Sequence, residues 1–186
     1  MVTEQIKKEV LKINNNFMLT DEDNYDFWNN HIKYVVKESL FLAEKLGADK
    51  EIVEIGALLH DIAMMKRVGT KVDHHINGAI IAEQILSNYG VDKQKQQRII
   101  GCVLHHRSSK NAENLEELCV ADGDILAHFS NIPMCFFSAF KLKGYTLNDM
   151  DKLKQWFEKD YNDLSEKSKV EFKQRYETII SVIFGE

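Results

Sequence analysis

The chain has 186 residues, of which 44% are hydrophobic and 28% are charged, and its formal net charge is −5. This length and composition are typical of one globular domain and exclude a disordered chain. The acidic balance and the scattered lysines offer no basic surface to a nucleic-acid polymer, and no apolar run reaches the ~18 residues of a membrane span. We therefore expect a single domain over residues 1–186, with neither a nucleic-acid polymer nor a membrane as its partner.

The cysteines and the N-terminus indicate the compartment. Cys102, Cys119 and Cys135 form no CxxC pair and lie in apolar runs, as structural thiols in a reducing compartment do. Residues 1–5 are polar and an amphipathic stretch follows them, which is unlike a signal peptide. The sequence therefore predicts a cytoplasmic protein.

Apolar residues recur at helical spacing along the first third of the chain. Residues 2–17 carry one such stripe, and residues 30–46 carry another before Gly47, which can end a helix. Between these stretches, the acidic run at 21–23 precedes Trp28 and predicts a short capped helix. Asp49 is expected to cap a central helix in which residues 52–59 are almost all apolar, as in a helix buried on most sides.

The same periodicity continues to the end of the chain. Asp73 is expected to cap a helix that starts at His74 and ends at Gly90, and Asp92 to cap a helix that ends near His105. Further helical stretches cover residues 115–128, 132–142, 147–161 and 165–184. β-Branched runs are short and two-residue turn signals are absent, so no strand is expected. The sequence predicts an all-α helical bundle.

Residues that ligate metals fall at the ends or on the inner faces of these helices. The central apolar run ends in His60-Asp61, where an unpaired buried charge would be costly. Imidazole and carboxylate together suit Fe, Mn, Zn or Ni better than an all-oxygen calcium site. A single histidine on a helix face is usually a packed side chain, but the whole set predicts a metal site. The candidates are His31, His60, Asp61, His74, His75, His105, His106, Asp122 and Asp124.

The position of a residue around its helix indicates which histidine of each doublet can face the site. Neighbouring side chains on a helix diverge by ~100°, so one residue of each doublet can point fully at the site. His106 falls near the apolar face of its helix and His105 points away, whereas His74 and His75 both stay open.

The motifs Leu58-Leu59-His60-Asp61-Ile62 and Ala121-Asp122-Gly123-Asp124, with His31 before them, resemble the HD-domain superfamily of metal-dependent phosphohydrolases. The resemblance covers residues 30–131. It implies a bundle of the HD-domain type, with residues 132–186 packing on its metal-site core. It also implies that His31, His60, Asp61 and Asp124 ligate one divalent transition metal. Asp124 is favoured over Asp122 because the second acid of the family's element is usually the ligand.

Some branches of this superfamily bind a second metal through histidines between the doublet and the last aspartate. The segments His74-His75-Ile76-Asn77-Gly78-Ala79 and Val103-Leu104-His105-His106 resemble the elements of those branches. The resemblance thus implies one or two metals per chain, with the Asp61 carboxylate as the natural bridge. The Gly-Tyr-Pro element of the cyclic-dinucleotide phosphodiesterase branch is missing after His106, so that substrate is not assigned. Ile125 stands where many members carry Lys or Arg.

The expected function is hydrolysis of a phosphate ester or phosphoanhydride in a small phosphorylated molecule such as a nucleotide. A bound metal lowers the pKa of water and polarises a phosphoryl oxygen, and Asp61 would act in catalysis by orienting that water. Several side chains are candidates for binding the substrate, although any one of the four Lys and Arg residues among them is, taken alone, more typical of solvated surface charge. They are Lys66, Arg67, Arg107, Lys110 and His128.

Two other functions fit the same residues. A histidine-rich set of six ligands also supports a di-iron oxygenase within this superfamily, which would contain iron and consume oxygen. A non-catalytic ligand-binding module with a degenerate site would bind its ligand without metal, and the intact ligand set argues against it.

Overall fold

The computed structural model describes residues 2–185, and within that range the chain is helical and contains no strand. Residues 1 and 186 of the predicted domain lie outside the described part. The prediction of an all-α fold is confirmed. The α-helices are α1 (Val2–Met18), α2 (Lys33–Leu46), α3 (Lys50–Leu59), α4 (Ile62–Met65), α5 (His74–Asn88), α6 (Lys93–His105), α7 (Leu115–Ser130), α8 (Ile132–Phe137), α9 (Met150–Asp163) and α10 (Glu166–Phe184). Shorter helical turns are η1 (Trp28–Ile32), η2 (Ser109–Asn111), η3 (Ser138–Leu142) and η4 (Leu147–Asp149).

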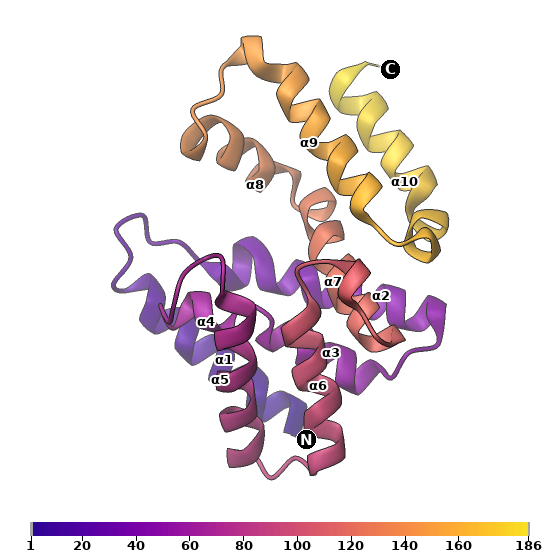
Figure 1. Cartoon of the computed structure of the whole chain (residues 1–186). Coiled ribbons are helices and arrows are strands. Elements are labelled where there is room, and N and C mark those ends of the chain that lie inside the picture. The colour runs from indigo at the N-terminus through magenta and orange to yellow at the C-terminus, as the bar shows by residue number, and fades with distance from the viewer. Residues whose placement is uncertain (1, 186) are drawn as a thin grey trace.

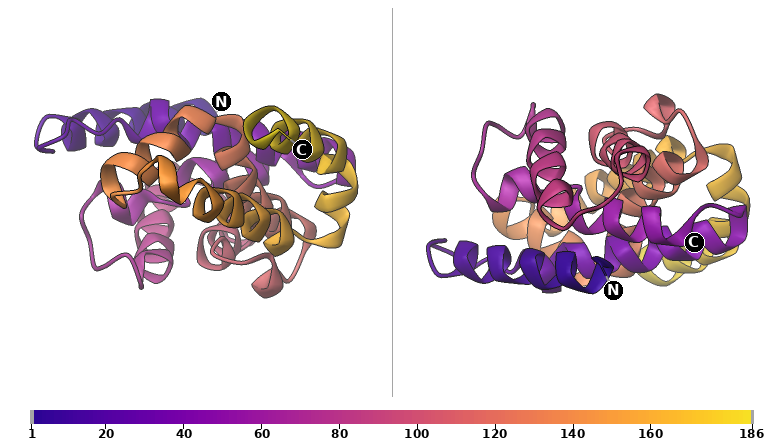
Figure 2. Two further views of the ribbon diagram at one scale, coloured as in Figure 1. Left: turned by 90° about the horizontal axis from the view of Figure 1, so that it is seen from above. Right: turned by 90° about the horizontal axis from the view of Figure 1, so that it is seen from below.

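The helices form two groups that α7 connects (Figure 1). The group α1 to α6 lies below, and α8, α9 and α10 lie above it in that view. Seen from above, α9 and α10 lie in front of the lower helices (Figure 2, left). One hydrophobic core cluster nevertheless runs through both groups, from Ile6 on α1 to Ile180 on α10.

Helix α3 is the most completely buried part of the lower group. Helices α1, α2, α6 and α7 all pack against it, so apolar side chains on every side of the helix are accommodated. Leu59 is fully buried at its C-terminal end, directly before His60. The Asp49 carboxylate accepts hydrogen bonds from the amides of Glu51 and Ile52, which confirms the predicted cap.

Two local expectations are wrong. The acidic run 21–23 lies in turns, where the Asp21 carboxylate accepts a hydrogen bond from the Tyr25 amide and Asn24 adopts a φ of 51°, and the short helix after it begins at Trp28, as η1, without a side-chain cap. The Asp73 side chain does not cap α5, because it accepts hydrogen bonds from the amide and hydroxyl of Thr70. In both cases an aspartate carboxylate accepts hydrogen bonds from residues of a neighbouring turn, so it does not cap a helix.

Helix α7 packs closely along α2, and Gly123 permits this contact. A Cβ atom at Gly123 would lie 2.9 Å from both the Cα and the amide nitrogen of Ser39 on α2. Gly56 plays a similar part between α3 and α6, where a Cβ would lie 2.6 Å from the Cβ of Cys102. The glycine in the otherwise apolar run of α7 therefore has a packing role beside the two acids that flank it.

Helix α7 is also the most apolar long helix of the chain, and most of its residues are buried. Among the described residues, no individual helix is long and apolar enough to cross a membrane. The stretch Leu115–Ser130 with Ile132–Leu142 meets that test by length and composition, but only as a pair bent by 82°.

Buried polar contacts attach the upper helices to the lower ones. Asp122, which is fully buried on α7, accepts hydrogen bonds from the amide and hydroxyl of Ser165 and from the hydroxyl of Ser168, 2.5–3.2 Å away. Farther along α10, Arg175 forms a two-armed ion pair with the buried Glu38 of α2, at 2.8 and 3.1 Å. These contacts fix α10 against α7 and α2.

Gly123→Ala should destabilise the protein by about 1–3 kcal/mol, because the added methyl group must push α7 away from the backbone of α2. The measurement is the free energy of unfolding in denaturant. Gly78→Ala is the matched control, since its Cβ would come no closer than 3.2 Å, to the side-chain tip of Val103, and would meet the His60 carbonyl oxygen at an ordinary contact distance of 3.5 Å. If the two variants were equally stable, the α2–α7 contact would not depend on Gly123.

Candidate metal centre

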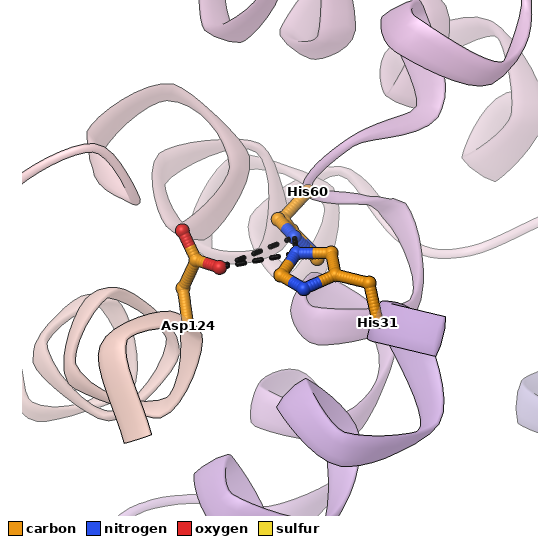
Figure 3. Close-up of side chains that lie close together, drawn as sticks. All are labelled: His31, His60 and Asp124. Atoms are coloured by element: carbon orange, nitrogen blue, oxygen red, sulfur yellow. Dashed lines mark hydrogen bonds and ion pairs between the residues drawn. The ribbon is translucent and has the colours of Figure 1, made fainter. Parts of the chain in front are cut away.

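Three of the predicted ligands meet where η1, α3 and α7 converge. His31 comes from the π-helical turn η1, His60 follows α3, and Asp124 lies in the middle of α7. The Nε2 atoms of the two histidines are 3.1 Å apart, and the Asp124 Oδ1 lies 3.1 Å from His31 Nε2 and 3.9 Å from His60 Nε2. Figure 3 shows the carboxylate pointing from its helix toward both imidazoles.

A second group of donors lies beside the first. His74 opens α5 and His106 follows α6, and their Nε2 atoms are 2.9 Å apart. The Asp61 Oδ1 lies 3.2 Å from His74 Nε2 and 3.9 Å from His106 Nε2. Within each group the three ligand atoms lie within 4.8 Å of one another.

Asp61 connects the two groups. Its Oδ2 lies 3.6 Å from the Nε2 atoms of both His31 and His60, while its Oδ1 faces the second group. One carboxylate oxygen is thus available to each group, which is the arrangement of a carboxylate that bridges two cations.

The histidine tautomers suit metal binding. Each of three imidazoles has its Nδ1 within hydrogen-bond distance of the carbonyl oxygen three residues earlier: His60 of Ala57 (2.7 Å), His74 of Lys71 (2.8 Å) and His106 of Val103 (2.6 Å). When Nδ1–H donates to that carbonyl, the neutral ring keeps its lone pair on Nε2. Two lone pairs that face each other cannot form a hydrogen bond, whereas a cation between them would be bound by both.

The spacing also fits a metal. Two nitrogen ligands ~2.1 Å from a metal and at right angles to each other are ~3.0 Å apart. The observed Nε2 pairs, at 2.9 and 3.1 Å, match that separation. The donor set of four imidazoles and two carboxylates could therefore hold a divalent transition metal in each group.

The electrostatics keep the carboxylates ionised. Burial opposes the charge of Asp61 and Asp124, but the neighbouring imidazoles outweigh it and hold the pKa of both carboxyl groups well below the usual range. Burial lowers the pKa of His106 to about 4, so this ring is neutral near pH 7. Burial also opposes the charge of His31, yet its hydrogen bond to Asp124 raises the pKa, and the hydrogen bond to Asp61 raises the pKa of His74. Metal binding would displace protons from these two rings.

The remaining ligand candidates lie outside both groups. His105 points away, and its Nδ1 lies 2.8 Å from the Glu117 carboxylate, in agreement with the expected helix phase. His75 stacks edge-on beside His74 without belonging to either donor group. Asp122 is committed to the serines of the α9–α10 junction.

A cavity of about 800 Å³ opens over the donor groups. Of the predicted substrate-binding residues, Arg107 and His128 line it. Lys66 and Arg67 line a separate hollow of about 410 Å³ against α1, because the chain turns away after α4, and Lys110 lines neither hollow. Sequence reasoning missed Tyr25, Phe27, Lys71, Met134, Lys143 and Trp156, which also line the cavity.

Comparison with known families agrees with this geometry. The model of the HD domain matches residues 29–128, which is more than half of the chain and includes all six donors. The chain belongs to the HD domain family. Its His31, His60-Asp61 and Asp124 are the residues expected to hold a metal in such a domain, and membership supports a metal-dependent hydrolase in general.

Solved structures share the fold. A predicted HD superfamily hydrolase from an uncultured Thermotogales bacterium is 23% identical, covers 92% of this chain and 91% of its own, and has a TM-score of 0.59. Bacillus subtilis YpgQ in complex with ADP is 20% identical, covers 98% of this chain and 91% of its own, and has a TM-score of 0.68.

Curated relatives match part of the chain. An uncharacterized protein of Clostridium beijerinckii is 30% identical over 95 residues, which cover 46% of this chain and 60% of that protein. A tRNA (cytidine(56)-2′-O)-methyltransferase of Thermoplasma volcanium is 33% identical over 81 residues, or 44% of this chain and 21% of that protein. The matches thus span about three fifths and one fifth of these relatives.

His106→Ala should lower the bound metal from about two ions per chain to about one, because the second group then keeps only Asp61 and His74. Metal analysis of protein purified without chelator measures this content. His105→Ala is the matched control, since it removes the neighbouring imidazole that faces Glu117, and it should leave the metal content unchanged. Unaltered metal content in His106→Ala would mean that the second group does not bind metal.

Proposed function

We propose that the protein is a metal-dependent phosphohydrolase whose substrate is a phosphate ester or phosphoanhydride of a small molecule, in the first place a nucleotide. The observation that carries this proposal is the pair of donor groups joined by Asp61 at the base of a cavity. His31, His60 and Asp124 would hold one metal, and His74 and His106 the other. Bound metals supply an activated water and polarise the phosphoryl oxygens.

The chain's own groups have distinct tasks in this reaction. Asp61 stays ionised and lies between the two groups, so its carboxylate can accept a hydrogen bond from the attacking water and orient it. Arg107 donates from Nη1 to the carbonyl of Val72 at 2.6 Å, which fixes the guanidinium at the cavity wall. Its other N–H groups, together with Lys71, can bind the non-bridging oxygens of a phosphate.

The cavity suits a nucleotide. Its volume of about 800 Å³ lies in the range of ligand sites, and aromatic side chains that can contact a base line part of it. Tyr25 and Phe27 lie on the side of η1, and Trp156 comes from α9. YpgQ, which shares the fold, binds ADP in its crystal structure, and this supports a nucleotide for the present chain.

A di-iron oxygenase is the second candidate, because the same four imidazoles and two carboxylates could hold two iron ions. The preserved donor set argues against a module that has lost its metal. The test is a metal analysis of protein purified without chelator, followed by assays of phosphate release from nucleotides and of oxygen uptake with the same sample. A phosphohydrolase should release phosphate, lose this activity with chelator and regain it with manganese. Bound iron with oxygen uptake and no phosphate release would overturn the proposal.

Arg107→Gln should raise KM roughly tenfold or more and change kcat less, because the variant loses a charged contact with the substrate phosphate. Steady-state kinetics on the nucleotide that the screen identifies measures both constants. Lys66→Gln is the matched control, since it removes a cation close in sequence to the donors but outside the cavity. Equal kinetics of the two variants would place the substrate phosphate away from Arg107.

A further inference from the structure

His128 carries a feature that the donor groups do not use. Its Nδ1 lies 2.7 Å from the Oδ2 of Asp160, a largely buried carboxylate on α9. The imidazole itself is about one-third exposed and lines the cavity over the donor groups. An aspartate-oriented histidine thus faces the space where the substrate would bind.

The position of His128 on α7 places it beside the reacting phosphate. His128 follows Asp124 by four residues, so the two side chains share one face of the helix, with Cβ atoms ~6 Å apart. Both side chains line the same cavity. A phosphoryl group at the donor groups would therefore lie within a single side-chain length of the imidazole.

The surroundings of His128 fix the ring at the wall of the cavity. The indole of Trp156 meets it edge-on at 5.8 Å, and the Cys135 thiol donates to the backbone carbonyl of His128 at 3.3 Å. Lys143 lies 3.6 Å from the centre of the Trp156 ring, so the charged groups around His128 include this cation together with Asp160 and, one turn earlier on α7, Asp124. Because Nδ1–H is held by Asp160, Nε2 is the nitrogen that remains for a substrate.

We propose that His128 donates a proton to the leaving group in the hydrolysis, with Asp160 as its positioning residue. The proposal rests on the proposed function. In the reaction, the oxygen of water forms a bond to phosphorus and the bond from phosphorus to the leaving oxygen breaks. The electron pair of the broken bond stays on the leaving oxygen, which takes the proton from Nε2 of His128. The proton lost by the water passes to solvent, and His128 regains a proton from solvent.

The arrangement along α7 favours this role over that of an extra phosphate ligand. Asp61 lies between the donor groups at the base of the cavity, where it can orient the attacking water. His128 lies one turn farther toward the C-terminal end of α7, which α8 follows, so its imidazole and the Asp61 carboxylate reach the cavity from different elements. In-line displacement requires such a separation between the attacking and the leaving oxygen.

His105 and Glu117 provide a matched control within the same chain. Their Nδ1–Oε2 distance is 2.8 Å, close to that of His128 and Asp160, and Glu117 is buried. Neither residue lines the cavity. The two pairs therefore share their chemistry and differ in their access to substrate.

The test compares two probes, the 4-nitrophenyl and the phenyl ester of thymidine 5′-monophosphate, with manganese-loaded protein. 4-Nitrophenolate leaves without a proton, whereas phenolate needs one, so loss of an acid slows the phenyl ester more. His128→Gln should reduce kcat/KM for the phenyl ester roughly 100-fold and for the nitrophenyl ester less than tenfold. Asp160→Asn should change the ratio of the two rates in the same direction, and His105→Gln should leave it unchanged.

The ratio of the two rates within one preparation does not depend on the folded fraction, so a partly unfolded variant cannot imitate the effect. An unchanged ratio in His128→Gln, whether or not both rates fall, would overturn the role of His128 and leave the proposed function standing. A wild-type enzyme that releases no phosphate from nucleotides and hydrolyses neither ester would overturn the proposed function, and the role of His128 with it. One that hydrolyses nucleotides but neither ester would overturn the role of His128 alone.

Discussion

The structure is organised around imidazole nitrogens that face one another at about 3 Å across a buried space. Without a cation, two neutral rings would present facing lone pairs and two protonated rings would repel each other, so the contact then requires one proton shared between the two rings. The chain holds three of the rings with backbone carbonyls one helical turn earlier, so rigid helix ends fix the donors. Asp61 then supplies the negative charge that the rings share. A metal would replace the shared proton in each group, which couples metal binding to the protonation of the rings and to the stability of the helix ends.

Four residues within a seven-residue stretch of α7 have different structural or functional roles. Asp122 accepts a hydrogen bond from Ser168 of α10, and Gly123 allows α2 to pack closely against α7. Asp124 belongs to a donor group, and His128 faces the cavity one turn later. These tasks do not conflict because they lie on different faces of the helix, apart from the last two, which share one. The unfavourable polar run inside an apolar helix is therefore explained by packing as much as by the site.

The sequence was sufficient to predict the elements of the fold that depend on local pattern. Helical periodicity, the cap at Asp49 and the phase that separates His106 from His105 all follow from neighbouring residues. The turns at 19–26 could not be predicted in this way. The hydrogen bond from the Tyr25 amide to the Asp21 carboxylate competes with the hydrogen bonds of a helix. The residues that line the cavity could not be predicted from the sequence either. Lys66 and Arg67 are close to the doublet in sequence, yet the chain turns away at Arg67, whose φ is 54°.

The hydrogen bond between His128 and Asp160 joins the last residue that matches the HD domain to a helix beyond the matched part of the chain. The HD domain match stops at residue 128, whereas Asp160, Trp156 and Lys143 belong to the helices that follow it. The matched core thus contains all six donor residues, and the later helices complete the cavity wall. A shared core with a separate wall lets related chains keep the same metal chemistry while they differ in the molecule they bind. In the proposed hydrolase, selectivity should therefore depend on the residues of α8 and α9 that line the cavity, while Asp122 and Glu38 fix α10 against the core.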